Sequence, residues 1–147
     1  DICLSVAKNM ANTLNITIPD KLQKMVDKGD LGKKSGRGFY EYEKGKPKLN
    51  KSSEQSSIPD IEDRMILRIL NECVACLREG IVEDRDLLDA GMVFGTGFAP
   101  FRGGPLHYAS ARGFENLLTA LTNLENKYGE RFKADTGWQD LIKGELT

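Results

Sequence analysis

The sequence predicts an all-α protein with one short strand or hairpin between its helical parts. Apolar residues recur at the three- and four-residue spacing of helix faces along most of the chain, and prolines and glycines stand where these faces begin and end. One short segment instead alternates and is rich in aromatic residues, which is typical of a strand. With 147 residues, 39% of them hydrophobic and 29% charged, the chain has the composition of a folded globular protein with a modest core.

Two helices are expected before residue 30. Apolar residues predict the first helix from the start of the chain; they are Cys3, Val6, Ala7, Met10 and Leu14. Pro19 is suited to be the first residue of the second helix, because the N–H that it lacks has no helical partner at that position. An apolar stripe of Leu22, Met25 and Val26 follows, and Gly29 is expected to end this helix.

A glycine-aromatic segment then interrupts the helical pattern. Residues 31–38 read LGKKSGRG, residues 39–42 read FYEY and resemble a strand, and Lys44-Gly45 is placed to turn the chain back over residues 46–49. Residues 51–57 are polar and rich in serine, which predicts a linker. We therefore expect one region over 1–50, a linker over 51–57 and a second, helical region over 58–147.

The second region opens with a long helix. Pro59 is expected in its first turn together with acidic residues, whose charge favours a helix N-terminus; these are Asp60, Glu62 and Asp63. A long buried stripe follows, made of Ile66, Ile69, Leu70, Cys73, Cys76 and Leu77. Gly80 is expected to end the helix.

Further helices are expected after residue 84. Asp84 is placed to cap a helix that carries Leu87, Leu88 and Met92, and a glycine-rich loop is expected from Phe94 to Gly104. Pro105 then opens a short helix that stops at Gly113. The next helical face consists of Phe114, Leu117, Leu118, Leu121 and Leu124, and a last turn is expected around Trp138, Leu141 and Ile142.

Several classes of partner are excluded by composition. The net charge of −1 gives no basic field for nucleic acid or an anionic membrane, and no apolar run approaches the ~20 residues that span a bilayer. The three cysteines are an odd number without a disulfide framework, which indicates a reducing, cytoplasmic setting. The chain begins at Asp1, directly in a helical pattern, with neither an initiator Met nor a signal peptide. We therefore expect it to be a piece of a longer protein.

None of the polar motifs predicts a complete catalytic or metal site. His107 has no carboxylate assigned to it by sequence, and we expect a surface or packing role. The pair Cys73 and Cys76 lies within a helical stripe and lacks a second ligand pair, so a structural role is favoured over zinc or redox chemistry. The spacing of the acidic residues at 83–89 does not match a calcium-binding loop.

Two segments remain candidates for contacts. Lys33, Lys34 and Arg37, with the glycines around them, suit either a phosphate contact or a tight loop that docks the aromatic strand, and the second interpretation is favoured. In residues 94–105, FGTGFAPFRGGP, the anchors Phe98 and Phe101 and the cation Arg102 indicate packing or an interface rather than catalysis.

Four segments together resemble one enzyme family. DKGDLGKKSGRGFYEYEKGKP is similar to the segment that follows the helical domain of 3-hydroxyacyl-CoA dehydrogenases. IEDRMILRILNECVACLREGIVEDRDLLDAGMVFGTGFAPFRGGPLHYA resembles the second C-terminal helical repeat of multifunctional fatty-acid oxidation enzymes, in particular the alpha subunits of bacterial complexes. DICLSVAKNMANTL resembles the last helix of the first repeat, and KYGERFKADTGWQDLIKGE resembles the closing segment.

The resemblance implies a fold and an activity for the parent protein. The fold is the helical dehydrogenase C-terminal domain, like that of 6-phosphogluconate dehydrogenase, with the first repeat ending in residues 1–50 and the second repeat in residues 58–147. The activity is NAD-dependent oxidation of an L-3-hydroxyacyl-CoA in fatty-acid β-oxidation, alongside an enoyl-CoA hydratase domain and a thiolase subunit.

The same resemblance places the chemistry outside this chain. The Rossmann domain that holds NAD, the catalytic His and Glu, and the opening helix of the first repeat would all precede Asp1. His107 does not match the catalytic His, and Asp63 stands where the first repeat has a substrate-facing Asn. We therefore expect no catalytic residue, no bound NAD and no metal here. The chain would act as scaffold and domain interface, with a CoA contact or subunit assembly as alternatives.

Overall fold

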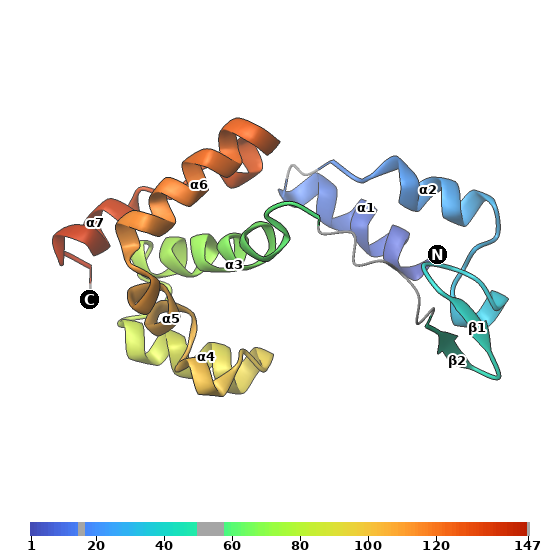
Figure 1. Ribbon diagram of the computed structural model, residues 1–147, viewed down its shortest axis with the longest axis horizontal. Helices are drawn as coiled ribbons and strands as arrows, with labels where there is room; N and C mark the ends of the chain where they lie inside the picture. Colours follow the sequence, from blue (N-terminus) through green and yellow to red (C-terminus); the bar gives the residue numbers. More distant parts are fainter. Residues whose placement is uncertain (15–16, 50–57, 147) are drawn as a thin grey trace. The chain divides into compact units, whose positions relative to one another are not determined.

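A computed structural model describes residues 1–14, 17–49 and 58–146. The chain divides into two compact units, Asp1–Ser56 and Ser57–Thr147, which are described separately below and are both visible in Figure 1. The expected linker over residues 51–57 lies outside the described residues. Helices dominate the described residues and one small antiparallel hairpin accompanies them, so the all-α fold class is confirmed.

The first unit contains two helices and a hairpin. Helices α1 (Ile2–Leu14) and α2 (Asp20–Asp27) are followed by the short 3₁₀ turn η1 (Lys33–Ser35) and by strands β1 (Glu41–Glu43) and β2 (Lys46–Lys48). The turn between the strands has positive φ at both Lys44 (50°) and Gly45 (77°), as a type I′ hairpin turn requires. The predicted hairpin is confirmed, although its first strand begins at Glu41, so Phe39 and Tyr40 precede it.

Helix α1 lies where it was predicted, and α2 begins at Asp20 with Pro19 as its N-cap, one residue later than predicted. The predicted apolar face of α1, however, is not a buried one. Val6 and Met10 are 50% and 47% exposed, and Cys3 is exposed as well. Leu4, which lies off the predicted stripe, is buried instead. The periodicity therefore predicted the helix correctly but predicted the wrong buried side. A unit of this size has too small a core to cover a whole helix face.

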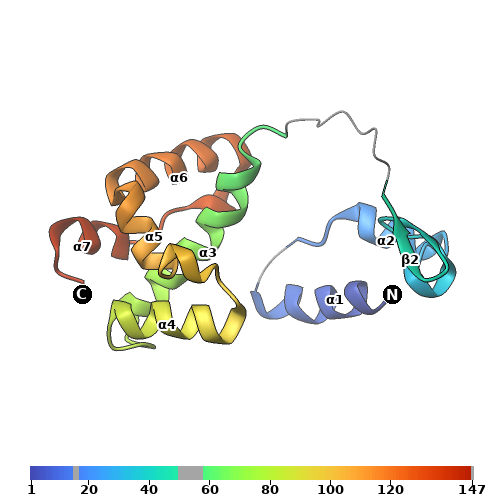
Figure 2. The ribbon, with the colours of Figure 1, turned by 60° about the horizontal axis from the view of Figure 1, so that its bottom comes forward.

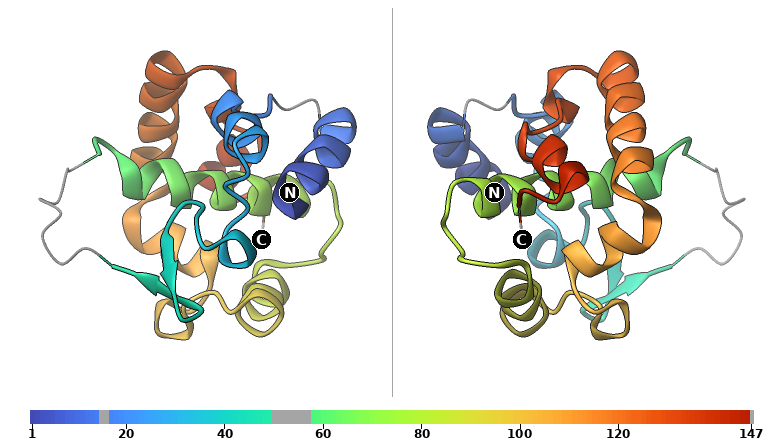
Figure 3. Two further views of the ribbon diagram at one scale, coloured as in Figure 1. Left: turned by 90° about the vertical axis from the view of Figure 1, so that its right-hand side faces the viewer. Right: turned by 90° about the vertical axis from the view of Figure 1, so that its left-hand side faces the viewer.

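The second unit is helical throughout its described residues. Its elements are α3 (Ile61–Arg78), α4 (Arg85–Thr96), the 3₁₀ turn η2 (Pro100–Arg102), α5 (Pro105–Arg112), α6 (Phe114–Tyr128), the 3₁₀ turn η3 (Glu130–Phe132) and α7 (Gly137–Lys143). Figures 1 and 2 show α3 in the middle of this unit, with α6 on one side and α4 on the other. The C-terminal α7 packs beside α6 and α3, as Figure 3 shows from the side.

The core of the second unit collects apolar side chains from every α-helix of the unit and from η3. Its fully buried large members include Leu67, Leu70, Val74, Leu106, Leu117, Leu121 and Trp138. Burial at ~25 cal/mol per Å² of apolar area makes this the main stabilising contribution to the unit. The predicted faces of α6 and α7 agree with this core, because Leu117, Leu121, Trp138 and Leu141 are all buried.

The predicted stripe on α3 needs a correction. Leu70, Cys73 and Leu77 are buried as expected, but Ile69 is 41% exposed, whereas Leu67 and Val74 are completely buried. The buried face is rotated toward Leu67 and Val74, because α5, α6 and α7 all pack against α3 and cover a wider arc than one stripe.

Two helix ends also differ from the prediction. Helix α3 begins at Ile61, after Asp60 in a left-handed conformation (φ 58°), so Pro59 precedes the helix and is not part of its first turn. Helix α4 begins at the predicted cap, where Asp84 Oδ1 accepts a hydrogen bond of 2.8 Å from Leu87 N. It then continues to Thr96 and ends at Gly97 (φ 75°), so Phe94 and Gly95 are helical and not part of the expected loop.

Candidate functional site

The cationic loop of the first unit holds all three predicted contact residues, and two of them are paired. Lys34 Nζ contacts the side chain of Asp1, and Arg37 Nε lies 3.5 Å from Asp30 Oδ1. No carboxylate within ion-pair distance of Lys33 is found among the described residues. The structure thus brings Lys33, Lys34 and Arg37 onto one loop and compensates part of its charge.

Several backbone donors of this loop are used within the loop. Gly32 N donates to Arg37 O (2.7 Å), Gly38 N to Tyr40 O (2.9 Å) and Tyr42 N to Gly36 O (2.8 Å). Ser35 Oγ accepts from Leu31 N (2.8 Å) and donates to Arg37 O (2.8 Å). A phosphate cradle needs free N–H groups that converge, whereas these bonds build a closed loop that leads into β1. The predicted CoA contact stays a prediction.

A Cβ on Gly38 would lie 2.7 Å from Gly32 Cα. This close approach explains why position 38 needs glycine, whereas Gly32, where a Cβ would meet nothing within 4 Å, needs it for its positive φ of 84°.

The predicted interface residues lie after α4 and differ in exposure. Phe98 is partly buried, while Phe101 is 84% exposed. The guanidinium of Arg102 lies 5.5 Å from the Phe101 ring centroid and 5.4 Å from that of Tyr108. Arg102 is thus within cation–π distance of two aromatic rings on this surface. The interface role expected for Phe98, Phe101 and Arg102 stays a prediction.

Asp89 is a buried acid that the sequence interpretation did not single out. Its carboxylate is 7% exposed and accepts hydrogen bonds from Leu106 N (2.6 Å) and His107 N (2.8 Å). These are backbone donors of the first turn of α5, so Asp89 on α4 caps a different helix. Gly104 makes room for it, since a Cβ there would lie 2.3 Å from Asp89 Cβ. The side chain of His107 is exposed, in line with the expected surface role.

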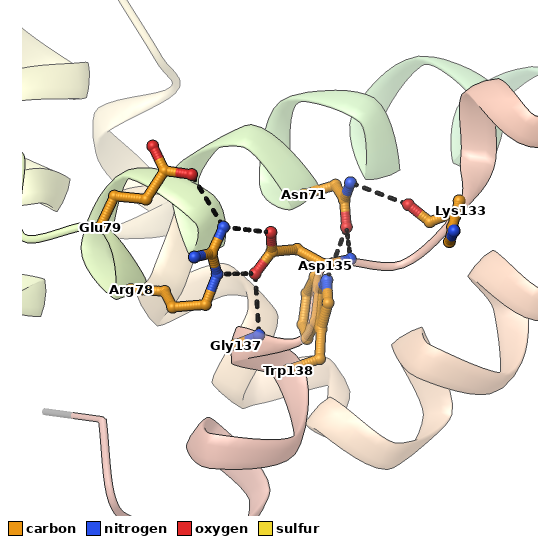
Figure 4. A network of polar contacts seen from close by, with 7 residues as sticks. All are labelled: Asn71, Arg78, Glu79, Lys133, Asp135, Gly137 and Trp138. Carbon is orange, nitrogen blue, oxygen red and sulfur yellow. Dashed lines mark hydrogen bonds and ion pairs between the residues drawn. The ribbon is translucent and has the colours of Figure 1, made fainter.

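Asn71 organises a second polar cluster, drawn in Figure 4, between α3 and the C-terminal residues. Its Oδ1 accepts from Trp138 Nε1 (2.9 Å) and Asp135 N (2.8 Å), and its Nδ2 donates to Lys133 O (3.1 Å). Asn71 is 8% exposed, so each of these contacts satisfies a group that has little or no access to water. A single Asn within an apolar run was the only sequence signal for this cluster.

An ion pair closes the same cluster. Arg78 donates to Asp135 through Nε (2.8 Å) and a terminal guanidinium nitrogen (2.9 Å), and that nitrogen also bonds Glu79 (2.8 Å). The hydrogen bonds from Arg78 hold the pKa of Asp135 below its ordinary value of 3.8, and Gly137 N adds to this effect. The geometry is that of a bidentate structural pair that fixes the tail on α3.

The two cysteines on α3 pack into or against the core of the second unit, Cys73 buried and Cys76 partly buried. Burial is the largest cause that raises the pKa of Cys73 to about 12, and the neighbouring Cys76 adds to it. A thiol with such a pKa stays protonated near neutral pH, which removes the reactive thiolate. Across residues 1–14, 17–49 and 58–146, no three His, Cys, Asp or Glu side chains gather in a way that would hold a metal ion.

An apolar groove of about 390 Å³ runs between α3 and α4. It is lined by Ile69, Glu72, Cys73, Cys76, Val82, Leu87, Leu88, Gly91 and Met92. Glu72 is the one charged side chain in this lining, and its carboxylate lies 3.3 Å from Arg68 on the same helix. With a single charged group in its lining, the groove suits contact with apolar surface rather than polar chemistry. None of the described helices has the length and apolar character needed to cross a membrane.

The chain has clear relatives among characterised proteins. It is 44% identical over 124 residues to the fatty acid oxidation complex subunit alpha of Aliivibrio fischeri, a match that covers 78% of this chain and 18% of that protein. The same subunit of Vibrio vulnificus is 37% identical over 123 residues, and that of a Shewanella species (strain MR-7) is 33% identical over 134 residues. No known family profile matches the chain.

The match covers only a small part of each relative. The chain spans less than a fifth of each of the three subunits. The resemblance inferred from its glycine-aromatic and FAPFRGGPL segments is confirmed by these matches. Over 78% of its length, the chain is homologous to one part of the alpha subunit of fatty acid oxidation complexes.

Proposed function

We propose that this chain is the C-terminal helical part of an NAD-dependent L-3-hydroxyacyl-CoA dehydrogenase of fatty-acid β-oxidation, within a multifunctional enzyme that also has enoyl-CoA hydratase activity. The observation that carries the proposal is the 44% identity to a fatty acid oxidation complex alpha subunit, over a match of 18% of that subunit. The chain would share the cytoplasmic location and the multi-subunit setting of such a complex.

Within that enzyme, the chain serves as scaffold and domain interface and is inert alone. Two features support this role. The polar side chains that are buried in the second unit, Asn71 and Asp89, bond backbone groups and an indole, so they are committed to holding helices together. Apolar surface remains at the groove between α3 and α4, where a sister domain can pack. The Rossmann domain, the catalytic His and Glu, and NAD belong to the preceding part of the parent.

An alternative places a direct CoA contact on the cationic loop. Its support is the position of three cations on one loop, with Lys33 lacking a carboxylate partner among the described residues. The internal use of the loop N–H groups favours the scaffold role instead. Titration calorimetry with CoA separates the two: equal heats from the wild type and from a triple Ala variant of Lys33, Lys34 and Arg37 would remove this alternative.

The dehydrogenase proposal is tested on this chain and on a relative. The pure chain, given NAD and a 3-hydroxyacyl-CoA, is expected to produce no NADH, and turnover would contradict its inert role. In the full-length Aliivibrio fischeri subunit, removal of the matched segment is expected to abolish the dehydrogenase reaction and spare most of the hydratase reaction. A truncated subunit with unchanged dehydrogenase activity would contradict the scaffold role. Co-purification with the thiolase subunit tests the assembly alternative.

A further inference from the structure

The surface around η2 carries a cation that has no acceptor in the part of the chain that the structure describes. The side chains of Arg68, Arg78 and Arg112 each donate hydrogen bonds to oxygen atoms of the second unit. The exposed guanidinium of Arg102 neither donates a hydrogen bond to a described residue nor forms an ion pair with one. Its hydrogen-bonding capacity is therefore available to a group outside the described chain.

Two aromatic rings hold this guanidinium in place. It lies 5.5 Å from the Phe101 ring centroid on η2 and 5.4 Å from the Tyr108 ring centroid on α5. The Tyr108 hydroxyl accepts a hydrogen bond of 3.3 Å from Arg112, which also pairs with Asp63 (2.7 Å). A guanidinium over ring faces keeps its N–H edge free for an acceptor. Because it is already held, it loses little side-chain entropy when an acceptor binds.

The sequence around Arg102 favours a negatively charged partner. Residues 97–112 contain two arginines, one histidine and no acidic residue, although acidic residues outnumber basic ones in the second unit as a whole. Phe101 adds an apolar ring that is 84% exposed. Arginine and aromatic side chains together are typical of the centre of a protein–protein contact. We call Phe101, Arg102 and Tyr108 the Arg102 site, and its chemistry suits a protein surface that presents a carboxylate.

The preceding part of the proposed parent protein is the partner that the comparisons favour. The match to the Aliivibrio fischeri subunit covers 18% of that protein, so most of a parent of similar length lies outside this chain. The inference thus rests on the proposed function. It adds a second surface to it, because no residue of the Arg102 site lines the groove between α3 and α4.

We propose that the Arg102 site binds a carboxylate from the preceding part of the parent chain through two hydrogen bonds from the guanidinium. The Phe101 ring packs on the apolar surface beside that carboxylate. The two rings of the site keep water from one side of the ion pair, which strengthens its electrostatic attraction. Burial of an apolar groove is non-directional, whereas a bidentate pair fixes an orientation. The Arg102 site thereby sets how the second unit is oriented in the parent.

Footprinting with phenylglyoxal, which modifies arginine, tests the proposal on the isolated chain and on the full-length gene product that contains it. Arg102 is expected to react readily in the isolated chain, because it is exposed. In the full-length protein it is expected to react at least about tenfold more slowly, since the acceptor occupies its N–H groups. Mass analysis of the peptides measures both rates.

Arg131 is the matched control for this experiment. It is also exposed, and its guanidinium lies 5.0 Å from a ring centroid, that of Phe132. Phe132 is buried, however, and an acid, Glu130, is adjacent in sequence. Arg131 thus lacks the exposed ring and the acid-free surroundings of the Arg102 site, and it is expected to react at similar rates in both proteins.

Substitutions in the full-length protein test whether the acceptor is charged. Arg102→Lys keeps the charge, and Arg102→Met keeps an apolar side chain of similar length. The melting temperature is expected to fall from Arg to Lys to Met, and the gap between Lys and Met is expected to narrow at high salt. Both variants are expected to melt alike in the isolated chain. Equal melting temperatures of the two full-length variants at low salt would contradict a carboxylate acceptor.

The proposal is overturned by equal reactivity of Arg102 in the two proteins, by equal protection of Arg102 and Arg131, or by a gene product no longer than this chain. Dehydrogenase activity of the same full-length preparation separates these results from a failure of the proposed function. An active dehydrogenase with unprotected Arg102 refutes only the Arg102 contact. An inactive protein with protected Arg102 refutes only the dehydrogenase assignment.

Discussion

Replacing Asn71 by Ala is expected to destabilise the second unit by about 3 kcal/mol or more. The change removes three hydrogen bonds, to Trp138 Nε1, Asp135 N and Lys133 O. At about 1 kcal/mol of net stability for each bond, their sum is ~3 kcal/mol, and a buried donor left unpaired costs ~1–3 kcal/mol more. The indole N–H is such a donor, since Trp138 is completely buried.

Urea unfolding followed by fluorescence measures this effect. Trp138 is the single tryptophan of the chain and bonds Asn71 directly, so its emission reports on the site itself. Asn116→Ala is the matched control, because the exposed Asn116 bonds only a carbonyl one turn back in sequence, Arg112 O (3.1 Å), and little loss is expected. A loss below about 1 kcal/mol for Asn71→Ala, or equal losses for the two variants, would refute the reasoning.

Three further predictions concern the thiols, the ion pair and the glycines. At pH 8, a maleimide is expected to label the exposed Cys3 in the folded chain and to leave the buried Cys73, whose pKa is about 12, unlabelled. Mass analysis of the peptides identifies the labelled cysteine, and rapid labelling of Cys73 would contradict its burial. Because Arg78 lowers the pKa of Asp135 below 3.8, the pair stabilises the fold above that pH and its contribution is lost as the pH falls through the lowered pKa. Unfolding measured from pH 6 to pH 2 is therefore expected to depend less steeply on pH in Asp135→Asn, and an unchanged slope would exclude the linkage. Gly104→Ala is expected to lower the melting temperature strongly, because position 104 has φ 120° and its Cβ would lie 2.3 Å from Asp89 Cβ. Gly91→Ala, whose Cβ would meet nothing within 4 Å, is expected to stabilise the folded second unit by roughly 0.5–1 kcal/mol. Equal effects of the two glycine variants would contradict this account.

The helices and most of their ends were predictable because they depend on residues that are neighbours in sequence. The hairpin turn at Lys44-Gly45, the cap at Asp84 and the stop at Gly113 each follow from local backbone chemistry. Gly95 was misleading, since the helix bonds around it outweigh its low propensity and the helix runs on to Gly97.

Features that depend on distant segments were not predictable. Whether Ile69 or Val74 is the buried residue on α3 depends on where α5, α6 and α7 lie, which periodicity in α3 does not contain. Asp89 looked like one more acid in a charged stretch, and only the fold brings it to the start of α5. The loop cations were grouped by sequence, but the pairing of Lys34 with Asp1 and of Arg37 with Asp30 depends on how the chain folds around the loop.

The bond between Asn71 and Trp138 also bears on the order of events during synthesis. The two residues are 67 positions apart, and the bonds from Asn71 to Lys133 and Asp135 span 62 and 64 positions. Local helices form early, whereas contacts of such separation must wait until both ends of the loop exist. On the ribosome, α3 therefore leaves the exit tunnel long before its polar partners. Until Trp138 emerges, the apolar side of α3 remains exposed as a surface that chaperones can bind.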